Sequence, residues 1–332
     1  MGNFKRVGET VKTVVEAGDL VGVDVSRYDH RKTRADIAGD RHGKGDASIL
    51  VDEDGRGGRV FNFKTSEYAR WHEDAGRRLS FEERRQRNIE WAVRNATRRE
   101  VERSETAFYS EVANQIYRSC KKAVTHPYLT KKRVKAFTAV EVIDAREVEA
   151  INRERGLRGA NPCYQINGEW HRMKGELLVI PLQIDGRLMT LEFIDAEGHK
   201  YFMKNGRKAG AYWMAHPIEV YQASNRIGIA EGVATALSVD MVKGYPCISA
   251  MDCGNLETVA KHWVNKFPEK TFEILSDEGK GEEEAKKAGQ AIGAPVVKPI
   301  FTEELIKAFQ LATGSKDNPT DWNDFCIAIG AL

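Results

Sequence analysis

The sequence predicts an α/β protein whose central feature is a mostly parallel, Rossmann-like sheet flanked by helices. Two observations lead to this prediction. Short apolar runs alternate with helix-length segments between residues 226 and 297, and two of those runs end in carboxylates. Strands that alternate with helices of this length are joined by right-handed crossovers, which make neighbouring strands parallel. Less regular units are expected upstream of this sheet.

Each predicted strand of the sheet is a short apolar run bounded by glycine, proline or polar residues. The predicted strands are residues 226–230, 247–251, 271–275 and 296–297, and the predicted helices between them are residues 233–243, 256–266 and 282–292. Asn255 is expected to occupy the N-cap of the second helix. Gly293 ends the third helix.

Acidic residues follow three of these strands. Glu231, Asp252 and Asp277 come at the carboxyl ends of their runs, where ligands bind in open parallel sheets. Carboxylate oxygens are hard ligands that suit Mg²⁺, and the helix N-termini at Val233 and Leu256 favour a phosphate nearby. A single carboxylate at a strand end is most simply a solvated loop residue. Two acidic motifs at matching ends of one sheet favour a functional site.

Several motifs resemble the toprim-domain DNA primases of plasmids and phages. They span about two hundred residues in the order expected of that family. The matching stretches are residues 126–129 (His-Pro-Tyr-Leu), 178–182, 191–194, 198–207, 229–236 (with Glu231-Gly232), 254–256 (Gly-Asn-Leu), Asp277 with the helix after it, and 319–324 (Pro-Thr-Asp-Trp-Asn-Asp).

The resemblance implies an enzyme that makes short primers on single-stranded DNA by Mg²⁺- or Mn²⁺-dependent nucleotidyl transfer. In that reading Glu231 is a general base or metal ligand, and Asp277 is a metal ligand. The residues expected to bind nucleic acid or nucleotide are Lys200, Lys204, Arg207 and Asn255, and further candidates at the site are Asp252, Asp321 and Asp324. The expected partners are template DNA and nucleoside triphosphates. No Walker phosphate loop occurs, so a replicative helicase is expected to be a separate protein.

One motif departs from the family pattern. The second acidic motif is usually Asp-any-Asp, whereas this chain has Asp277-Glu278-Gly279. Glu278 is the expected replacement metal ligand, with Glu282 as another option, although alternation along a strand would point Glu278 away from Asp277. Two alternatives therefore stay open. One is a catalytically inactive toprim-fold protein that binds DNA or a replication protein, and the other is a toprim nuclease.

The resemblance and the local patterns together divide the chain into five expected units. These are residues 1–68 (a degenerate zinc-ribbon-like β unit), 69–124 (a helical connector), 125–222 (a basic α+β subdomain), 223–300 (the toprim domain) and 301–332 (a C-terminal segment with the Asp-Trp-Asn-Asp motif). In that last segment, Asp321 is expected either to cap the final helix or to lie near the metal.

Upstream of the main sheet, patterns predict local structure. Hairpins are expected around residues 52–58, 185–186 and 197–198. Phe108, Val112 and Ile116 recur at a four-residue step typical of a buried helix stripe. The basic residues between 200 and 208 lie beside aromatic residues, a combination that can hold phosphates and stack on bases, although a solvated hairpin is the plainer reading for each alone.

The first 68 residues lack the cysteines of a zinc ribbon, and His30 and His42 alone cannot complete a tetrahedral site, so no zinc is expected. Arg41, Lys44 and Arg56 are expected either to touch DNA or to belong to a unit that merely packs.

Composition sets limits on the remaining possibilities. The 332 residues carry a net charge of only +2, so nucleic-acid affinity must come from local patches. Five scattered cysteines show neither metal-site nor disulfide spacing, which fits a reducing compartment. No apolar run is long enough to cross a bilayer, and the start lacks a signal-peptide core. The expected location is the cytoplasm of a bacterial host.

Overall fold

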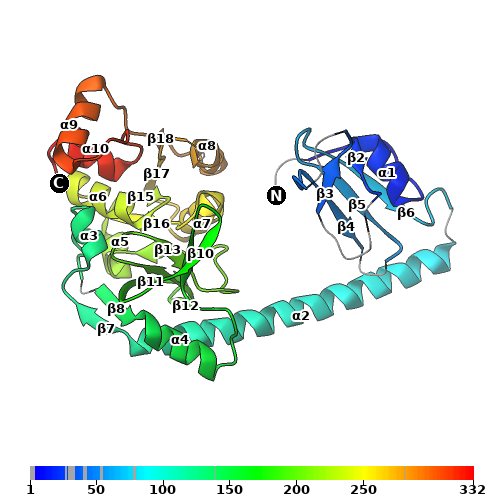
Figure 1. Ribbon diagram of the computed structural model, residues 1–332, viewed down its shortest axis with the longest axis horizontal. Helices are drawn as coiled ribbons and strands as arrows, with labels where there is room; N and C mark the ends of the chain where they lie inside the picture. The colour runs from blue at the N-terminus through cyan, green and yellow to red at the C-terminus, as the bar shows by residue number, and fades with distance from the viewer. Residues whose placement is uncertain are drawn as a thin grey trace. The chain divides into compact units, whose positions relative to one another are not determined.

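The computed structural model describes residues 4–26, 28, 34–39, 43–52, 55–77, 80–138, 140–279 and 281–332, with the backbone alone for Arg84. The chain forms two compact units, Met1–Ala96 and Thr97–Leu332 (Figure 1). His30, Arg41 and His42 lie outside the described residues. None of the described helices combines the length and the apolarity needed to span a membrane.

The first unit is a six-stranded sheet covered by one helix. The sheet order is β1 (Lys5–Arg6), β6 (Glu67–His72), β5 (Gly57–Asn62), β4 (Ala47–Val51), β3 (Arg34–Ile37) and β2 (Val23–Asp24). Helix α1 (Val14–Val21) packs on β5 and β6. A capping box between Thr13 and Glu16 starts α1, and Gly22 ends it in the left-handed conformation. Ile49, Val60 and Trp71 lie in the core beneath the helix.

The structure corrects one boundary and confirms one hairpin in this unit. Strands β4 and β5 pair antiparallel around Gly55, as predicted. The predicted helical connector begins too early, because residues up to His72 belong to β6. Ala69 and Trp71 alternate with more exposed neighbours, which is the period of a strand. Arg56 forms ion pairs with Glu73 and Asp74, and Lys44 is exposed.

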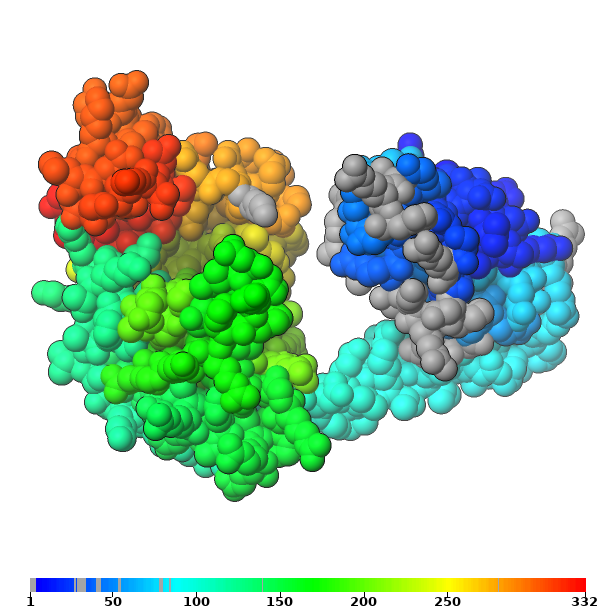
Figure 2. Space-filling view, in the orientation of Figure 1, coloured from blue at the N-terminus to red at the C-terminus, as the bar shows by residue number. Residues whose placement is uncertain are grey.

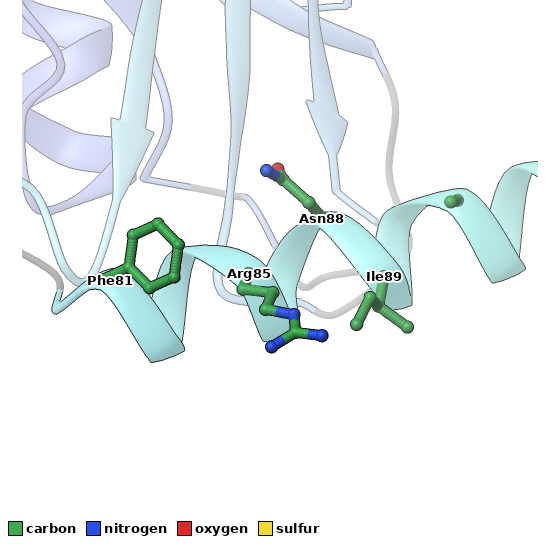
Figure 3. Close-up of a pocket in the computed structure, with 5 residues that line it drawn as sticks. Phe81, Arg85, Asn88 and Ile89 are labelled. Carbon is green, nitrogen blue, oxygen red and sulfur yellow. The ribbon is translucent and has the colours of Figure 1, made fainter.

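Helix α2 (Phe81–Ser119) begins in the first unit and ends in the second. Its C-terminal part is buried at Val112 and Ile116, as the four-residue step predicted, whereas Phe108 is 38% exposed. Near its start, α2 borders a broad hollow of about 810 Å³ lined by Phe81, Arg85, Asn88, Ile89 and Ala92 (Figure 3). The described residues that line this hollow include neither a carboxylate nor a lysine.

The second unit begins with an antiparallel sheet. Its order is β13 (Lys200–Phe202), β12 (Arg187–Ile194), β11 (Glu176–Ile184), β8 (Val140–Asp144) and β7 (Lys121–Ala123), with helices α3 (Pro127–Lys131) and α4 (Ala145–Glu154) beside it and a separate hairpin of β9 (Cys163–Ile166) and β10 (Glu169–Arg172). Both predicted hairpins are present. Asp185 and Gly186 have φ values of 48° and 80°, which suit a tight two-residue turn.

A second, largely parallel sheet lies beside the first. Its order is β14 (Trp213–Met214), β16 (Cys247–Ser249), β15 (Arg226–Ala230), β17 (Thr271–Leu275) and β18 (Val296–Val297); β14 alone is antiparallel to its neighbour among these described strands. The connecting helices are α6 (Val233–Lys243), α7 (Leu256–Lys266) and α8 (Gly281–Ile292), with α5 (Ile218–Ala223) before β15. The predicted mixed α/β fold is therefore confirmed as several sheets, one of them largely parallel.

Packing joins the two sheets of this unit and its C-terminal segment. Ile180 and Ile194 of the antiparallel sheet share a core cluster with Val233 and Leu237 of α6. Two further helices, α9 (Glu303–Thr313) and α10 (Trp322–Ala328), contact each other, and α10 packs on α6. In the space-filling view these C-terminal helices form one end of the unit, in orange and red (Figure 2). The C-terminal segment thus lies against the helix that follows Glu231.

Candidate active site

A cavity of about 340 Å³ lies in the second unit at the carboxyl ends of β15 and β17. Four acidic residues line it. Three come from distant parts of the sequence, Glu231 after β15, Asp277 after β17 and Asp321 before α10, and Glu197 lies between β12 and β13. Strands β15 and β17 are adjacent and parallel, so the residues that follow them meet at one edge of the sheet. Lysines from α3 and β13 line the same cavity: Lys131, Lys132 and Lys200.

The Asp-Trp-Asn-Asp motif holds Asp321 in this position. The Asp321 carboxylate accepts a hydrogen bond from the backbone N–H of Asp324 at 2.8 Å and so caps α10. The buried Trp322 donates its indole N–H to the carbonyl of Val297 at 3.4 Å. The backbone N–H of Glu278 also donates to the carbonyl of Thr320 at 2.8 Å. The motif is therefore fastened to the strand end that carries Asp277.

Asn323 fastens the motif to the lysine side of the cavity. Its fully buried amide donates to the carbonyl of Lys132 at 2.6 Å and to the Ser238 hydroxyl at 2.9 Å. These bonds join α10 to α3 and α6.

Burial and crowding raise the pKa values of the carboxylates. Burial, followed by the nearby charges of Asp321 and Glu231, raises the pKa of Asp277 to about 7. A hydrogen bond from the Thr235 hydroxyl at 3.4 Å opposes this rise. Burial and the charge of Asp252 also raise the pKa of Glu231, against the lowering effect of Lys200. A cation in the cavity would relieve this repulsion.

The carboxylates of the cavity come from separate elements. Among the described residues, the group whose ligand atoms all lie within 4.8 Å of one another is Asp195, Glu197 and His199, in the β12–β13 hairpin, and Glu197 also lines the cavity. Mg²⁺ commonly takes one or two carboxylates and completes its octahedron with water and substrate phosphates. The hard oxygens of the cavity therefore fit Mg²⁺ or Mn²⁺.

Ion pairs, a hydrogen bond and an aromatic contact hold the three lysines that line the cavity. Lys132 pairs with Asp321 at 3.5 Å and Asp324 at 3.8 Å. Burial lowers the pKa of Lys132, but these two carboxylates raise it more, so it stays above its ordinary value. The Lys131 ammonium donates to the Glu197 carbonyl at 3.0 Å. The Lys200 ammonium lies 5.9 Å from the centre of the Tyr128 ring, which also lines the cavity.

The structure brings together four of the residues proposed from the sequence: Glu231, Asp277, Asp321 and Lys200. Asp324 lies behind Asp321, in the ion pair with Lys132. Asp252 forms an ion pair with Lys208 at 2.7 Å. Lys208 thus joins the acidic edge.

Three proposed residues lie elsewhere. Glu278, the expected replacement ligand, is exposed and lies outside the cavity lining, beyond the end of β17 at Leu275. Lys204 and Arg207 are solvent-accessible and lie outside the lining.

Asn255 lies at the N-cap position of α7, as predicted, although its side chain forms no cap bond. Its amide accepts a hydrogen bond from the backbone N–H of Gly210 and donates to the carbonyls of Lys208, Ala211 and Ala250. This amide ties residues 208–211 to the sheet. The binding role expected of Asn255 stays a prediction.

Sequence reasoning missed Tyr128, Lys131, Lys132 and Thr235 as lining residues. The first three belong to or follow the His-Pro-Tyr-Leu motif, so that motif already pointed to the segment. Thr235 lies in the first turn of α6, on the side of Asp277. Gly281, at the start of α8, lies against Glu231: a Cβ there would lie 2.7 Å from the Glu231 Oε2 atom.

A cavity that sets carboxylates against lysines is typical of proteins that act on phosphates with divalent cations. Sequence comparison identifies the class, because the chain is a homologue of DNA primases. It is 28% identical over 286 residues to a DNA primase TraC of Escherichia coli, covering 82% of this chain and 18% of that protein. A second DNA primase TraC of Escherichia coli is 26% identical over 285 residues, covering 82% and 24%. The chain thus spans less than a quarter of the length of these relatives.

Solved primase structures share lower similarity. The DnaG primase catalytic domain bound to single-stranded DNA matches with 10% identity and a TM-score of 0.39, covering 60% of this chain and 74% of that chain. The RNA polymerase domain of Mycobacterium tuberculosis primase DnaG matches with 12% identity and a TM-score of 0.37, covering 68% and 77%. No family model matches the chain.

Proposed function

We propose that this chain contains the catalytic core of a DNA primase from a phage or plasmid, with residues 223–300 as its toprim domain. The observation that carries the proposal is the convergence of Glu231, Asp277 and Asp321 on one cavity, opposite lysines. The homology to DNA primases supports the same function. Because the chain covers only part of those relatives, primer synthesis by this chain is itself part of the proposal.

Mg²⁺ or Mn²⁺ is the proposed cofactor, held by Glu231, Asp277 and Asp321. The fit rests on their hard oxygens and on the mutual repulsion that raises the pKa of Asp277. When bound, such a cation would neutralise the charge that grows on the transferred phosphoryl group and the leaving pyrophosphate. Glu278 has no place in this set, because it faces solvent.

The residues of the chain have distinct proposed roles in the reaction. Lys131 and Lys200 bind phosphate oxygens of a nucleoside triphosphate. Glu231 is a metal ligand or accepts the proton of the attacking hydroxyl, which displaces pyrophosphate from the α-phosphate of the next nucleotide. Lys132 holds Asp321 in place through their ion pair. Lys204 and Arg207, exposed outside the cavity, are proposed to contact the single-stranded template.

The proposed setting is DNA replication in a bacterial host cytoplasm. The partners are single-stranded DNA, nucleoside triphosphates and a helicase on a separate protein. The residue 1–68 region is proposed to be a zinc-free counterpart of a primase zinc ribbon. These elements of the proposal rest on the family resemblance.

Primer synthesis by the purified chain tests the proposal. The chain is incubated with single-stranded DNA, labelled nucleotides and Mg²⁺ or Mn²⁺, beside Glu231→Gln and a control, Glu257→Gln. Glu257 is an exposed carboxylate on α7 that pairs with Lys261. We expect short labelled products from the wild type and the control, and a loss of at least about a hundredfold in Glu231→Gln.

Other outcomes would favour the two alternatives. A shortened template would indicate a toprim nuclease that uses the same carboxylates for hydrolysis. DNA binding with neither product would indicate a catalytically inactive binding protein. Glu278 is exposed, so an active enzyme would need another carboxylate as its metal ligand, and Asp321 lines the cavity. Asp321→Asn is therefore compared in the same assay. An inactive binding protein would be favoured if Asp321 does not serve as that ligand.

A further inference from the structure

Glu192 is a carboxylate buried behind the lysine side of the cavity. It lies on β12, is 3% exposed, and its Oε2 atom has no hydrogen-bond partner among the described residues. A buried carboxylate without such bonds costs several kcal/mol, and a leucine or isoleucine in its place would cost nothing of the kind. An unsatisfied buried charge of this type calls for a role outside folding.

The sheet register places Glu192 on the same face of the sheet as Lys200. Glu192 pairs with Phe202 on β13, and Ile194 pairs with Lys200. Residues two apart on a strand share a face, so Glu192, Phe202 and Lys200 all lie on one side of the sheet. Ile194 on that same side packs against α6 in the core beneath the cavity.

A second lysine, Lys208, lies over the ring of a cross-strand neighbour of Glu192. The Lys208 ammonium lies 4.4 Å from the centre of the Phe202 ring, and Phe202 is the direct cross-strand neighbour of Glu192. Lys200 lines the cavity. Lys200 and Lys208 are the charges that most stabilise the ionised form of Glu192, whose pKa burial raises to about 7.

Lysines and carboxylates line the same cavity, so they can pair with each other in place of binding ligands. A lysine is a long, flexible cation, and in an empty cavity it would pair with the carboxylates of Glu231 or Asp321 and block them. A carboxylate behind Lys200 offers it a competing partner. We infer that Glu192 is a positioning residue, which holds Lys200 against the inner wall so that its ammonium group and the carboxylates of the cavity stay open to separate ligands.

This inference deepens the proposed function, since it relies on the lysines as a phosphate-binding wall. The link between Glu192 and Lys200, however, can be measured without any ligand. A double-mutant cycle on unfolding uses Glu192→Gln, Lys200→Met and the double variant. We expect Lys200→Met to lower the urea midpoint in the wild-type background, because it strands the buried carboxylate, and to have much less effect in the Glu192→Gln background.

Two controls sharpen the cycle. Lys131→Met removes a lysine of the same cavity and should shift the midpoint equally in both backgrounds. Lys200→Arg keeps the charge and should restore the wild-type midpoint, which tests the link even if Glu192→Gln does not fold. Equal effects of Lys200→Met in the two backgrounds, or no rescue by arginine, would overturn the inference.

Titration with inorganic tripolyphosphate separates positioning from simple charge. If Glu192 only adds negative charge, Glu192→Gln should bind the anion more tightly than the wild type. If Glu192 positions Lys200, the variant should bind it about tenfold more weakly, a change of roughly 1.4 kcal/mol. As a control, Glu273→Gln removes another buried carboxylate, one paired with Arg226 at the opposite end of the strands, and should bind like the wild type.

The two measurements fail independently. A wild type that does not bind tripolyphosphate would contradict the phosphate-binding role in the proposed function, while the unfolding cycle would still decide whether Glu192 acts on Lys200. Equal or tighter binding by a folded Glu192→Gln variant would overturn the positioning role.

Discussion

At the scale of single residues, the second unit contains buried acidic side chains whose ionised form is disfavoured by burial. Glu192 and Asp277 both have pKa values raised to about 7, yet their surroundings differ. Asp277 faces other carboxylates in a cavity, whereas Glu192 lies in the sheet with lysines as its neighbouring charges. The pKa is therefore raised both in Asp277, a proposed metal ligand, and in Glu192, a proposed positioning residue.

The pKa of Glu192 predicts a pH dependence of stability. Its folded-state pKa of about 7 lies above the ordinary value of 4.5, so its protonation stabilises the fold. That contribution is fully present below about pH 4.5 and is lost as the pH rises through about 7. Glutamine does not ionise, so Glu192→Gln does not lose unfolding free energy as the pH rises. The variant should therefore be more stable than the wild type above pH 7, by at most about 3 kcal/mol.

Urea unfolding at pH 5 and pH 8 measures this difference. The stability gain of Glu192→Gln over the wild type should be larger at pH 8 than at pH 5. An equal difference at both values would mean that Glu192 keeps a similar pKa in the folded and unfolded states.

At the scale of elements, α10 is the helix that completes the cavity, and Asn323 holds it there. Asn323→Ala would leave the Lys132 carbonyl and the Ser238 hydroxyl without this donor in a buried setting. We expect a loss of about 1–3 kcal/mol in unfolding free energy. The exposed Gln290→Ala on α8 serves as the control and should change stability by less than about 0.5 kcal/mol. A similar loss in both variants would argue against the bridging role.

The elements that the sequence predicted well are those with strong local patterns. The runs at β15 and β17 are apolar, end in acidic residues and alternate with helix-length segments, so their positions and the meeting of Glu231 with Asp277 followed directly. The first unit was harder, because β1 and β2 are two residues long and β1 pairs with a strand some sixty residues later. Such pairings are decided by tertiary packing, which local patterns do not contain.

The arrival of Asp321 at the cavity was equally hidden in the sequence. Its motif resembled the closing motif of primases, but cap and metal-edge roles were equally compatible with the pattern. The structure combines them: the carboxylate that caps α10 also lines the cavity. Glu278 was expected as the replacement ligand because it follows Asp277 directly in the chain, but in the structure its side chain is exposed in the loop after β17.

At the scale of the whole molecule, a divalent cation should stabilise the second unit. A ligand that binds only the folded state adds about 2.7 kcal/mol when its concentration is a hundred times the dissociation constant. Thermal unfolding in Mg²⁺ or Mn²⁺ against EDTA should therefore show a higher Tm with the cation. Asp277→Asn should lose most of that increase. An increase that persists in Asp277→Asn would place the cation elsewhere in the molecule.

The distance along the chain between the cavity carboxylates has a consequence for biosynthesis. Residues 231 and 277 belong to one sheet, but Asp321 reaches it only after α9 and the loop that follows. A polypeptide whose synthesis stops before residue 321 could form every described strand and still lack one carboxylate and the bridge to Lys132. Synthesis through α10 is therefore needed before the cavity holds Asp321 beside Glu231 and Asp277.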